Sequence, residues 1–300
     1  GYMWGTVGLT YNPKYIPDEE VKSWDVLRNP AYSGKVLMKD AFRDVYTSLL
    51  VALNKEAIDA GEKSIEKISF DTSEESIKLV EDYLNSFKES VCGWEADFGK
   101  EQMTKELAWI NLTWSGDAQW AIDEAVEMGL DLRYVIPEEG SVAWFDGWVI
   151  PKYARNVKAA SYFINYMCRP DIALRNMDAI GYVSAVATPE ILEEKIDTTL
   201  TNYSDLSYFF GPDADSVQVD PVQYPDKKVI ERCAVIRDFS KKEDLQKVLE
   251  MWSRVKGDNL NTGIVLLIFA VFGGLFVWMI ISKINKYRRK NHRKYRRRRR

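Results

Sequence analysis

Carboxylates and large aromatic side chains follow several predicted strands of this chain. Asp40 and Asp44 come after the apolar run VLM, and Trp114 after INLT; Trp144 and Asp146 lie in AWFDGW, and Tyr182 lies in IGYVSA. Ligand sites in open α/β sheets form at the carboxyl ends of strands. Carboxylates pair with ammonium groups, while aromatic faces attract cations and cover methylene groups. The pattern predicts a site for an extended, protonated amine.

Each of these side chains also has a structural alternative. Asp40 precedes a predicted helix as a possible N-cap, and Asp44 suits the positive end of that helix dipole. Trp114 could belong to the core. Asp146 is the hardest to explain structurally, because an unpaired acid beside three aromatic residues is costly to bury.

Histidine and cysteine offer little further chemistry. The only histidine is His292, and Cys92, Cys168 and Cys233 have neither metal-ligand nor redox spacing. Catalysis would have to use carboxylates, lysine or tyrosine. We therefore expect no cofactor and no metal. Carboxylate pairs are common by chance, so we also expect no enzyme activity.

Charge is distributed unevenly along the chain. Twelve of the 41 lysines and arginines lie in residues 283–300, where there is no Asp or Glu. Residues 1–282 therefore carry 29 basic side chains against 45 acidic ones. An acidic body favours cationic ligands and disfavours nucleic acid.

The segment IVLLIFAVFGGLFVWMII, residues 264–281, is uncharged and almost wholly apolar. Its length predicts a single membrane-spanning helix. Because basic flanks stay on the cytoplasmic side, we expect the tail from residue 282 to be cytoplasmic and to contact anionic lipid. The body would then be extracellular or periplasmic.

Strand and helix patterns alternate along the body and predict an open α/β sheet. Expected strands cover residues 7–11, 36–38, 107–112, 132–136 and 142–151. Expected helices cover residues 41–53, 73–90, 118–128, 156–169, 170–180, 188–195 and 241–255, with a turn at 114–118.

Several motifs together resemble the spermidine/putrescine-binding proteins of bacterial ABC importers. They are GYMWGTVGLTYN, SWDVLRNPAYSGKVLM, KDAFRDVY, TWSGDA, PEEGSVAWFDGWVIPKYARN, YFINYMCRPDIA and IGYVSA, in that order. The resemblance implies a two-lobed, periplasmic-binding-protein-like α/β architecture, with the second lobe complete and the first partial. It also implies ligand-binding roles for Asp44, Trp114, Trp144, Asp146 and Tyr182. The family's second acid falls on Ala41, with Asp40 one place earlier.

The resemblance and the membrane segment together divide the chain. We expect a crossover strand at 1–10, the second lobe at 11–145, a return to the first lobe at 146–257, a linker at 258–263, the membrane helix at 264–281 and the tail at 282–300. The opening residues read as a strand entered part-way, so we expect first-lobe residues to precede Gly1.

The function implied by the resemblance is capture of a polyamine between two lobes and its delivery to ABC permease subunits. One alternative keeps the fold and changes the solute to another small cationic or organic molecule. A second alternative is a membrane-anchored hydrolase that uses two carboxylates.

Overall fold

A computed structural model describes residues 1–257 together with 269–270, 272–273, 276, 278–279 and 283. The chain divides into two compact units, 1–255 and 256–300. The predicted membrane helix and basic tail lie largely outside the described residues. Within the described part, no helix is both long and apolar enough to cross a membrane.

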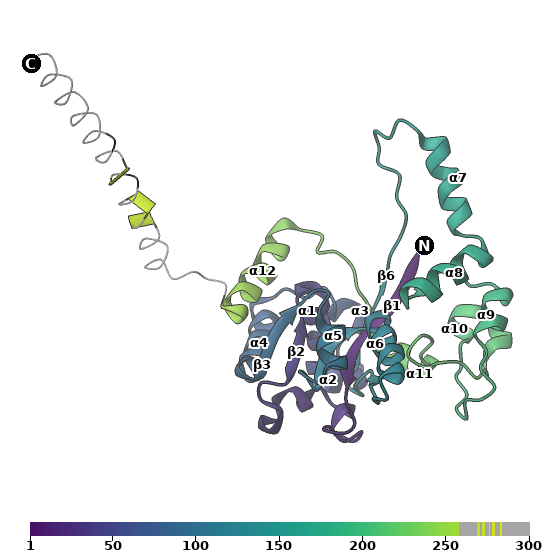
Figure 1. Ribbon diagram of the computed structural model, residues 1–300, viewed down its shortest axis with the longest axis horizontal. Helices are drawn as coiled ribbons and strands as arrows, with labels where there is room; N and C mark the ends of the chain where they lie inside the picture. Colours follow the sequence, from purple (N-terminus) through teal and green to yellow (C-terminus); the bar gives the residue numbers. More distant parts are fainter. Residues whose placement is uncertain (258–268, 271, 274–275, 277, 280–282, 284–300) are drawn as a thin grey trace, which may run out of the picture. The chain divides into compact units, whose positions relative to one another are not determined.

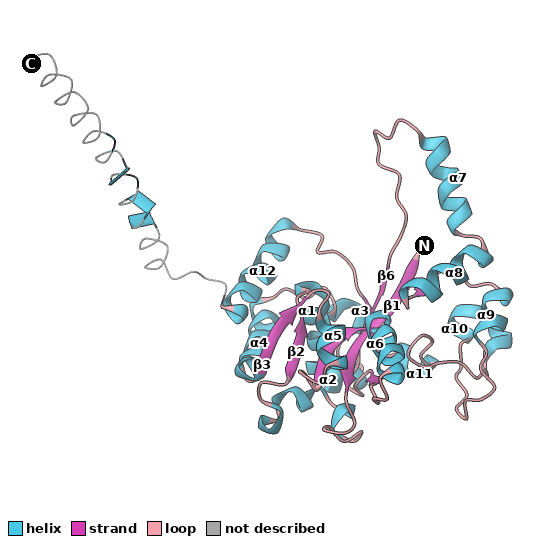
Figure 2. Cartoon of the chain, viewed as in Figure 1, coloured by secondary structure: helices cyan, strands magenta, loops and turns pink. Residues whose placement is uncertain are grey.

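Eight strands of the described part form one mixed sheet, in the order β3-β2-β4-β1-β6-β8, with β5 and β7 also paired to β1. Figure 2 shows the strands in magenta. Their bounds are β1 Met3–Tyr11, β2 Val36–Lys39, β3 Val91–Glu95, β4 Ile110–Trp114, β5 Arg133–Val135, β6 Ser141–Phe145, β7 Val183–Ser184 and β8 Cys233–Val235. Strand β2 runs parallel to β3 and β4, and β6 runs parallel to β8, whereas β1 is antiparallel to all its neighbours.

Helices α1 to α6 accompany the strands β2 to β5, and α7 to α11 follow β6 along the chain (Figure 1). Their bounds are α1 Phe42–Leu53, α2 Lys55–Asp59, α3 Ile65–Ile68, α4 Glu74–Asn85, α5 Gly99–Thr104, α6 Ser115–Glu127, α7 Val157–Met167, α8 Pro170–Ile180, α9 Pro189–Lys195, α10 Ser207–Phe210, α11 Lys227–Ile230 and α12 Lys242–Lys256.

Strand β1 joins the two halves of the sheet. Its residues Val7–Tyr11 pair with β4, whereas Trp4–Thr6 pair with β6. All nine residues are buried, as expected for a central strand covered on both faces. The strand begins four residues earlier than the predicted strand at residues 7–11. One element therefore positions the ends of both β4 and β6.

Two main apolar clusters lie along the sheet. The larger one combines β1, β2, β4, α1 and α4, and it also contains Val248, Met251, Trp252 and Val255 of α12. The second cluster gathers Trp4 with residues of α8, β7 and the segments that follow, including Met177 and Tyr224. The last helix of the predicted 146–257 return thus packs with α4 and β3, elements of the predicted second lobe: Arg254 pairs with Glu81, and the Trp252 ring lies against Trp94.

The helix ends agree with their local sequence signals. Ser73 caps α4 by accepting a hydrogen bond from the Ser76 N–H, and Ile77, Val80 and Leu84 form the buried face at helical spacing. Helix α8 starts at Pro170 and stops at Gly181, whose φ of 76° is left-handed. These ends match the predicted boundaries closely.

Several predicted boundaries were wrong. The helix expected at 73–90 stops at Asn85, and the strand expected at 107–112 is β4, Ile110–Trp114. The expected turn at 114–118 is the start of α6, because Trp114 stays extended and Ser115 begins the helix. The expected strand at 142–151 stops at Phe145, which pairs with Trp4 near the first residue of β1. The backbone of Asp146 still hydrogen-bonds to Met3 and Tyr2, whereas residues 147–151 are not part of the sheet.

Candidate functional site

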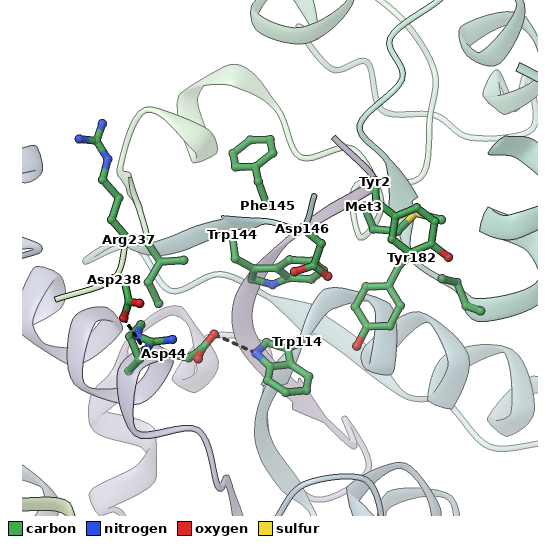
Figure 3. A pocket seen from close by; sticks show the side chains of 13 residues that line it. Tyr2, Met3, Asp44, Trp114, Trp144, Phe145, Asp146, Tyr182, Arg237 and Asp238 are labelled. Carbon is green, nitrogen blue, oxygen red and sulfur yellow. Dashed lines mark hydrogen bonds and ion pairs between the residues drawn. The ribbon is translucent and has the colours of Figure 1, made fainter. Parts of the chain in front are cut away.

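A cavity of about 520 Å³ opens where β4 and β6 end (Figure 3). Its walls come from the start of β1, the first turn of α1, the ends of β4 and β6, and the segments at 180–182 and 236–238. The lining residues are Tyr2, Met3, Arg43, Asp44, Trp114, Trp144, Phe145, Asp146, Ile180, Tyr182, Ile236, Arg237 and Asp238. Five of the six predicted site residues therefore line one cavity.

Asp40 is the exception, and its predicted role as an N-cap was also wrong. Helix α1 is preceded by Ala41, and no side chain caps it. The backbone N–H of Asp40 donates to the Glu95 carbonyl at 2.7 Å, which continues the pairing with β3. The Asp40 carboxylate instead accepts a hydrogen bond from Trp252 Nε1 at 3.2 Å, on the side where α12 packs.

Asp44 and Trp114 are joined directly. Trp114 Nε1 donates a hydrogen bond to Asp44 Oδ1 at 3.0 Å (Figure 3). Burial raises the pKa of the Asp44 carboxyl, and this hydrogen bond works in the opposite direction. The pair therefore presents a partly desolvated carboxylate and an aromatic ring to the same cavity.

Asp146 is held through its backbone. Its N–H donates to the Met3 carbonyl and its own carbonyl accepts from the Tyr2 N–H, both at 2.8 Å. The residue is exposed, and partial burial raises the pKa of its carboxyl. No described residue gives this carboxylate a hydrogen bond or an ion pair. It is therefore available to a cationic ligand.

Trp144 and Tyr182 form a T-shaped pair with ring centroids 5.4 Å apart. Two glycines lie against these rings. A Cβ at Gly5 would lie 2.7 Å from the Trp144 ring, and one at Gly116 would lie 2.3 Å from the Tyr182 ring. Both distances are shorter than real Cβ contacts. The absence of a Cβ at these two glycines therefore leaves room for the two aromatic rings.

A buried ion cluster beneath Trp114 was missed by the sequence analysis. Lys39 Nζ lies 2.6 Å from Asp117 Oδ2 and 3.1 Å from Glu95 Oε1, and the Lys39 side chain is only 1% exposed. The Tyr182 hydroxyl donates to Asp117 Oδ1 at 2.9 Å. The Lys39 ammonium also lies 4.2 Å from the centre of the Trp114 ring. The cluster thus touches two of the cavity's aromatic residues.

Two arginines of the cavity were also missed. Arg43 pairs with Asp238 through an Nη2–Oδ1 contact of 2.7 Å, and Arg237 lies beside them. These residues join α1 to the strand-like segment that follows β8. The only sequence signal was the RD dipeptide at 237–238, which is common on any surface.

The side chains of the cavity are suited to recognising a cation. Among the described residues, no group of three or more histidine, cysteine or acidic side chains is placed to hold a metal ion. The cavity instead combines acids with indole and phenol rings, which bind cations without changing them. Fold and site together define a solute-binding protein.

Comparison with known proteins identifies the family of this chain. A model of the bacterial extracellular solute-binding protein family matches residues 1–202. The chain belongs to that family. This membership agrees with the prediction that the chain is not an enzyme, and it removes the basis for the alternative hydrolase reading.

Individual relatives are more distant. The spermidine/putrescine-binding periplasmic protein of Escherichia coli is 25% identical over 208 residues, covering 68% of this chain and 54% of that protein. The putrescine-binding periplasmic protein SpuD of Pseudomonas aeruginosa is 25% identical over 277 residues, covering 85% and 64% respectively. The chain spans only about half to two thirds of the length of such relatives.

Solved structures confirm the α/β periplasmic-binding-protein fold. A putative spermidine/putrescine ABC transporter protein from Listeria monocytogenes is 29% identical with a TM-score of 0.63. A spermidine/putrescine ABC transporter substrate-binding protein from Streptococcus pneumoniae is 26% identical with a TM-score of 0.61. Each match covers 85% of this chain and 67% of the other.

Proposed function

We propose that this chain captures a polyamine, such as spermidine or putrescine, and delivers it to the permease subunits of an ABC importer. The observation that carries this proposal is the gathering of Asp44, Trp114, Trp144, Asp146 and Tyr182 around one cavity. These side chains come from four segments far apart in the sequence. Their convergence is difficult to explain by packing alone, because two carboxylates are drawn into an aromatic surrounding.

The chemistry of the cavity supports a cationic ligand. The Asp146 carboxylate can pair with one ammonium group, and the rings of Trp144 and Tyr182 can cover the neighbouring methylenes. Partial burial of Asp44 and Asp146 strengthens such pairing, since charges attract more strongly away from water. The names of the relatives point to the same class of ligand.

Capture between two lobes remains part of the proposal. In this view residues 11–145 form the second lobe, residues from 146 return to the first, and the cavity is one wall of the ligand site. The relatives are longer than this chain, so the complete site would include residues beyond those of this sequence.

A second candidate ligand is a small amine that also carries an acceptor group. Arg43 and Arg237 line the same cavity as the acids. In the described structure, Trp144 Nε1 and Arg43 Nε are buried donors without a hydrogen-bond partner. A carboxylate or carbonyl on the ligand would suit these groups, as buried donors are normally satisfied.

Attachment to the membrane also belongs to the proposal. The apolar run at 264–281 and the basic residues after it support a single-pass anchor with the body outside the cytoplasm.

A thermal-shift screen of the full-length natural protein tests the proposed function. Putrescine, spermidine and spermine should raise the melting temperature, since a ligand that binds the folded state stabilises it. Neutral diols of equal length and simple amino acids serve as controls. Stabilisation by the diols but not by the amines would contradict the proposal, and stabilisation by amino acids would favour the second candidate.

A further inference from the structure

The buried cluster under the cavity contains its own cation. Lys39 ends β2, and its ammonium lies within 3.1 Å of carboxylate oxygens of both Glu95 and Asp117. Glu95 accepts further hydrogen bonds from the Gly99 N–H and the Asn111 amide. These two donors hold the Glu95 carboxylate in place within the cluster.

Asp117 is fully engaged as well. Its Oδ2 faces Lys39 at 2.6 Å, while its Oδ1 accepts from the Tyr182 hydroxyl at 2.9 Å and lies 3.4 Å from Lys100 Nζ. Two lysines therefore balance the two buried acids. The cluster contacts the Trp114 and Tyr182 rings, but its carboxylates are already paired. They therefore leave no negative charge for a ligand beside these rings.

The Lys39 ammonium also uses the Trp114 ring. At 4.2 Å from the ring centre, it lies within the range of a cation–π contact. A ligand that placed an ammonium on the same indole would share the ring with the buried Lys39 ammonium, whose charge Glu95 and Asp117 offset in part. The repulsion that remains between the two ammonium groups is stronger there than in bulk water. Hydrocarbon against Trp114 would meet no such penalty.

Most of the acids that line the cavity already have a partner within the protein. Asp238 is paired with Arg43, and Asp44 accepts the Trp114 indole N–H. Asp146 alone among them receives no hydrogen bond or ion pair from the described residues. Among these acids, Asp146 is therefore the one left to pair with a ligand ammonium.

We propose that Lys39 is a specificity-determining residue: its buried ammonium occupies the place of a ligand ammonium beside Trp114, so the site prefers a diamine to a longer triamine. This inference rests on the proposed amine-binding function. It differs from that function in assigning the preference to a side chain that the ligand does not touch.

Calorimetry on the full-length natural protein, with 1,4-diaminobutane and spermidine in the same buffer, tests the inference. The parent protein should bind the diamine at least about tenfold more tightly, and Lys39→Met should reduce this ratio by about tenfold or more. Lys39→Arg keeps the charge and should keep the preference. Glu95→Gln keeps Lys39 and removes one carboxylate that balances it, so it should keep or strengthen the preference.

Lys39→Met alone strands buried carboxylates, so it could fail to fold. The double variant Lys39→Met/Glu95→Gln removes one carboxylate charge with the lysine and leaves Asp117 with Lys100. Circular dichroism checks that each variant is folded. If a folded variant without Lys39 keeps the parent's ratio, or if the parent prefers spermidine, the inference is overturned although amine binding stands. If the parent binds neither amine, the proposed function itself fails.

Discussion

Trp114 Nε1 lies 3.0 Å from Asp44 Oδ1, although the two residues are 70 positions apart in the sequence. The contact joins the last residue of β4 to the first turn of α1. It fixes the orientation of an indole ring and a carboxylate at once, because the hydrogen bond requires the ring edge to face the acid. This contact makes Asp44 a useful probe of how the cavity balances stability against binding.

Asp44→Asn should stabilise the fold at neutral pH while weakening amine binding. Burial raises the pKa of Asp44 above its unfolded value. Its contribution to stability is therefore fully present below the unfolded pKa and is lost as the pH rises through the folded pKa. We expect the variant to melt about 2–4 °C above the parent at pH 7, the shift that roughly 1 kcal/mol produces in a domain of this size.

The pH series supplies the control for this variant. The difference in melting temperature should shrink as the pH falls through the pKa of Asp44, since the parent carboxyl then becomes neutral too. A parent that is more stable than Asp44→Asn at pH 7 would mean that the Trp114 hydrogen bond outweighs the cost of burial.

Asp146→Asn should reduce amine affinity by roughly thirtyfold to several thousandfold, because loss of one partner of a desolvated charge pair typically costs about 2–5 kcal/mol. Asp40→Asn is the matched control. It makes the same change in an acid that lies against Trp252, outside the cavity. Calorimetry should show affinity close to the parent for this control. Equal losses in both variants would assign the effect to the fold rather than to ligand contact.

Tyr182→Phe should destabilise the protein by about 1–3 kcal/mol, since it removes a hydrogen bond to a buried charged group. The ring contact with Trp144 is retained, so amine affinity should change little. Tyr208→Phe is a control that removes a hydrogen bond to the neutral Pro225 carbonyl. Urea unfolding measures both. A large loss of affinity without loss of stability in Tyr182→Phe would place its hydroxyl on the ligand.

The amides of α7 should exchange with deuterium faster than those of α1. No residue of α7 is buried, and Tyr162, Phe163 and Tyr166 are exposed. Helix α1 has nearly the same length and buries most of its residues. Local opening requires less free energy where fewer apolar contacts are broken. Exchange mass spectrometry that finds α7 as protected as α1 would show that other residues cover it in solution.

Protease added to intact protoplasts should remove the body and spare the tail from Lys283 onward. The charge step across residues 264–281 motivates this topology. Antibody tags at each end of the chain report which part survives, and a detergent-lysed sample controls for protease access. Survival of the body in intact cells would reverse the orientation.

The sequence predicted the residues around the cavity better than what lies beneath it. Asp44, Trp114, Asp146 and Tyr182 each follow or flank a strand end, so strand periodicity and residue type were enough to select them. Their ligand-binding roles stay predictions. Asp40 was misplaced because backbone pairing with β3 continues for two residues longer than the apolar pattern indicates.

The Lys39 cluster could not be predicted in the same way. A lysine after three apolar residues resembles the exposed end of a strand, and Glu95 and Asp117 resemble ordinary surface acids. Their burial depends on β3, β2 and β4 lying side by side, and this order is not determined by local sequence patterns. The packing of α12 on α4 and β3 was missed for the same reason.

The two glycines against the rings of the cavity constrain any attempt to redesign it. A library intended to change the solute would naturally vary Trp144 and Tyr182. At Gly5 and Gly116, however, even a methyl group would collide with those rings. Substitution there would displace both recognition elements whatever the new ligand. A mutagenesis scheme should therefore hold both glycines constant. A smaller ring at 182 would make room for an alanine at Gly116, whereas at Gly5 the Ser115 hydroxyl oxygen would still lie 2.6 Å away.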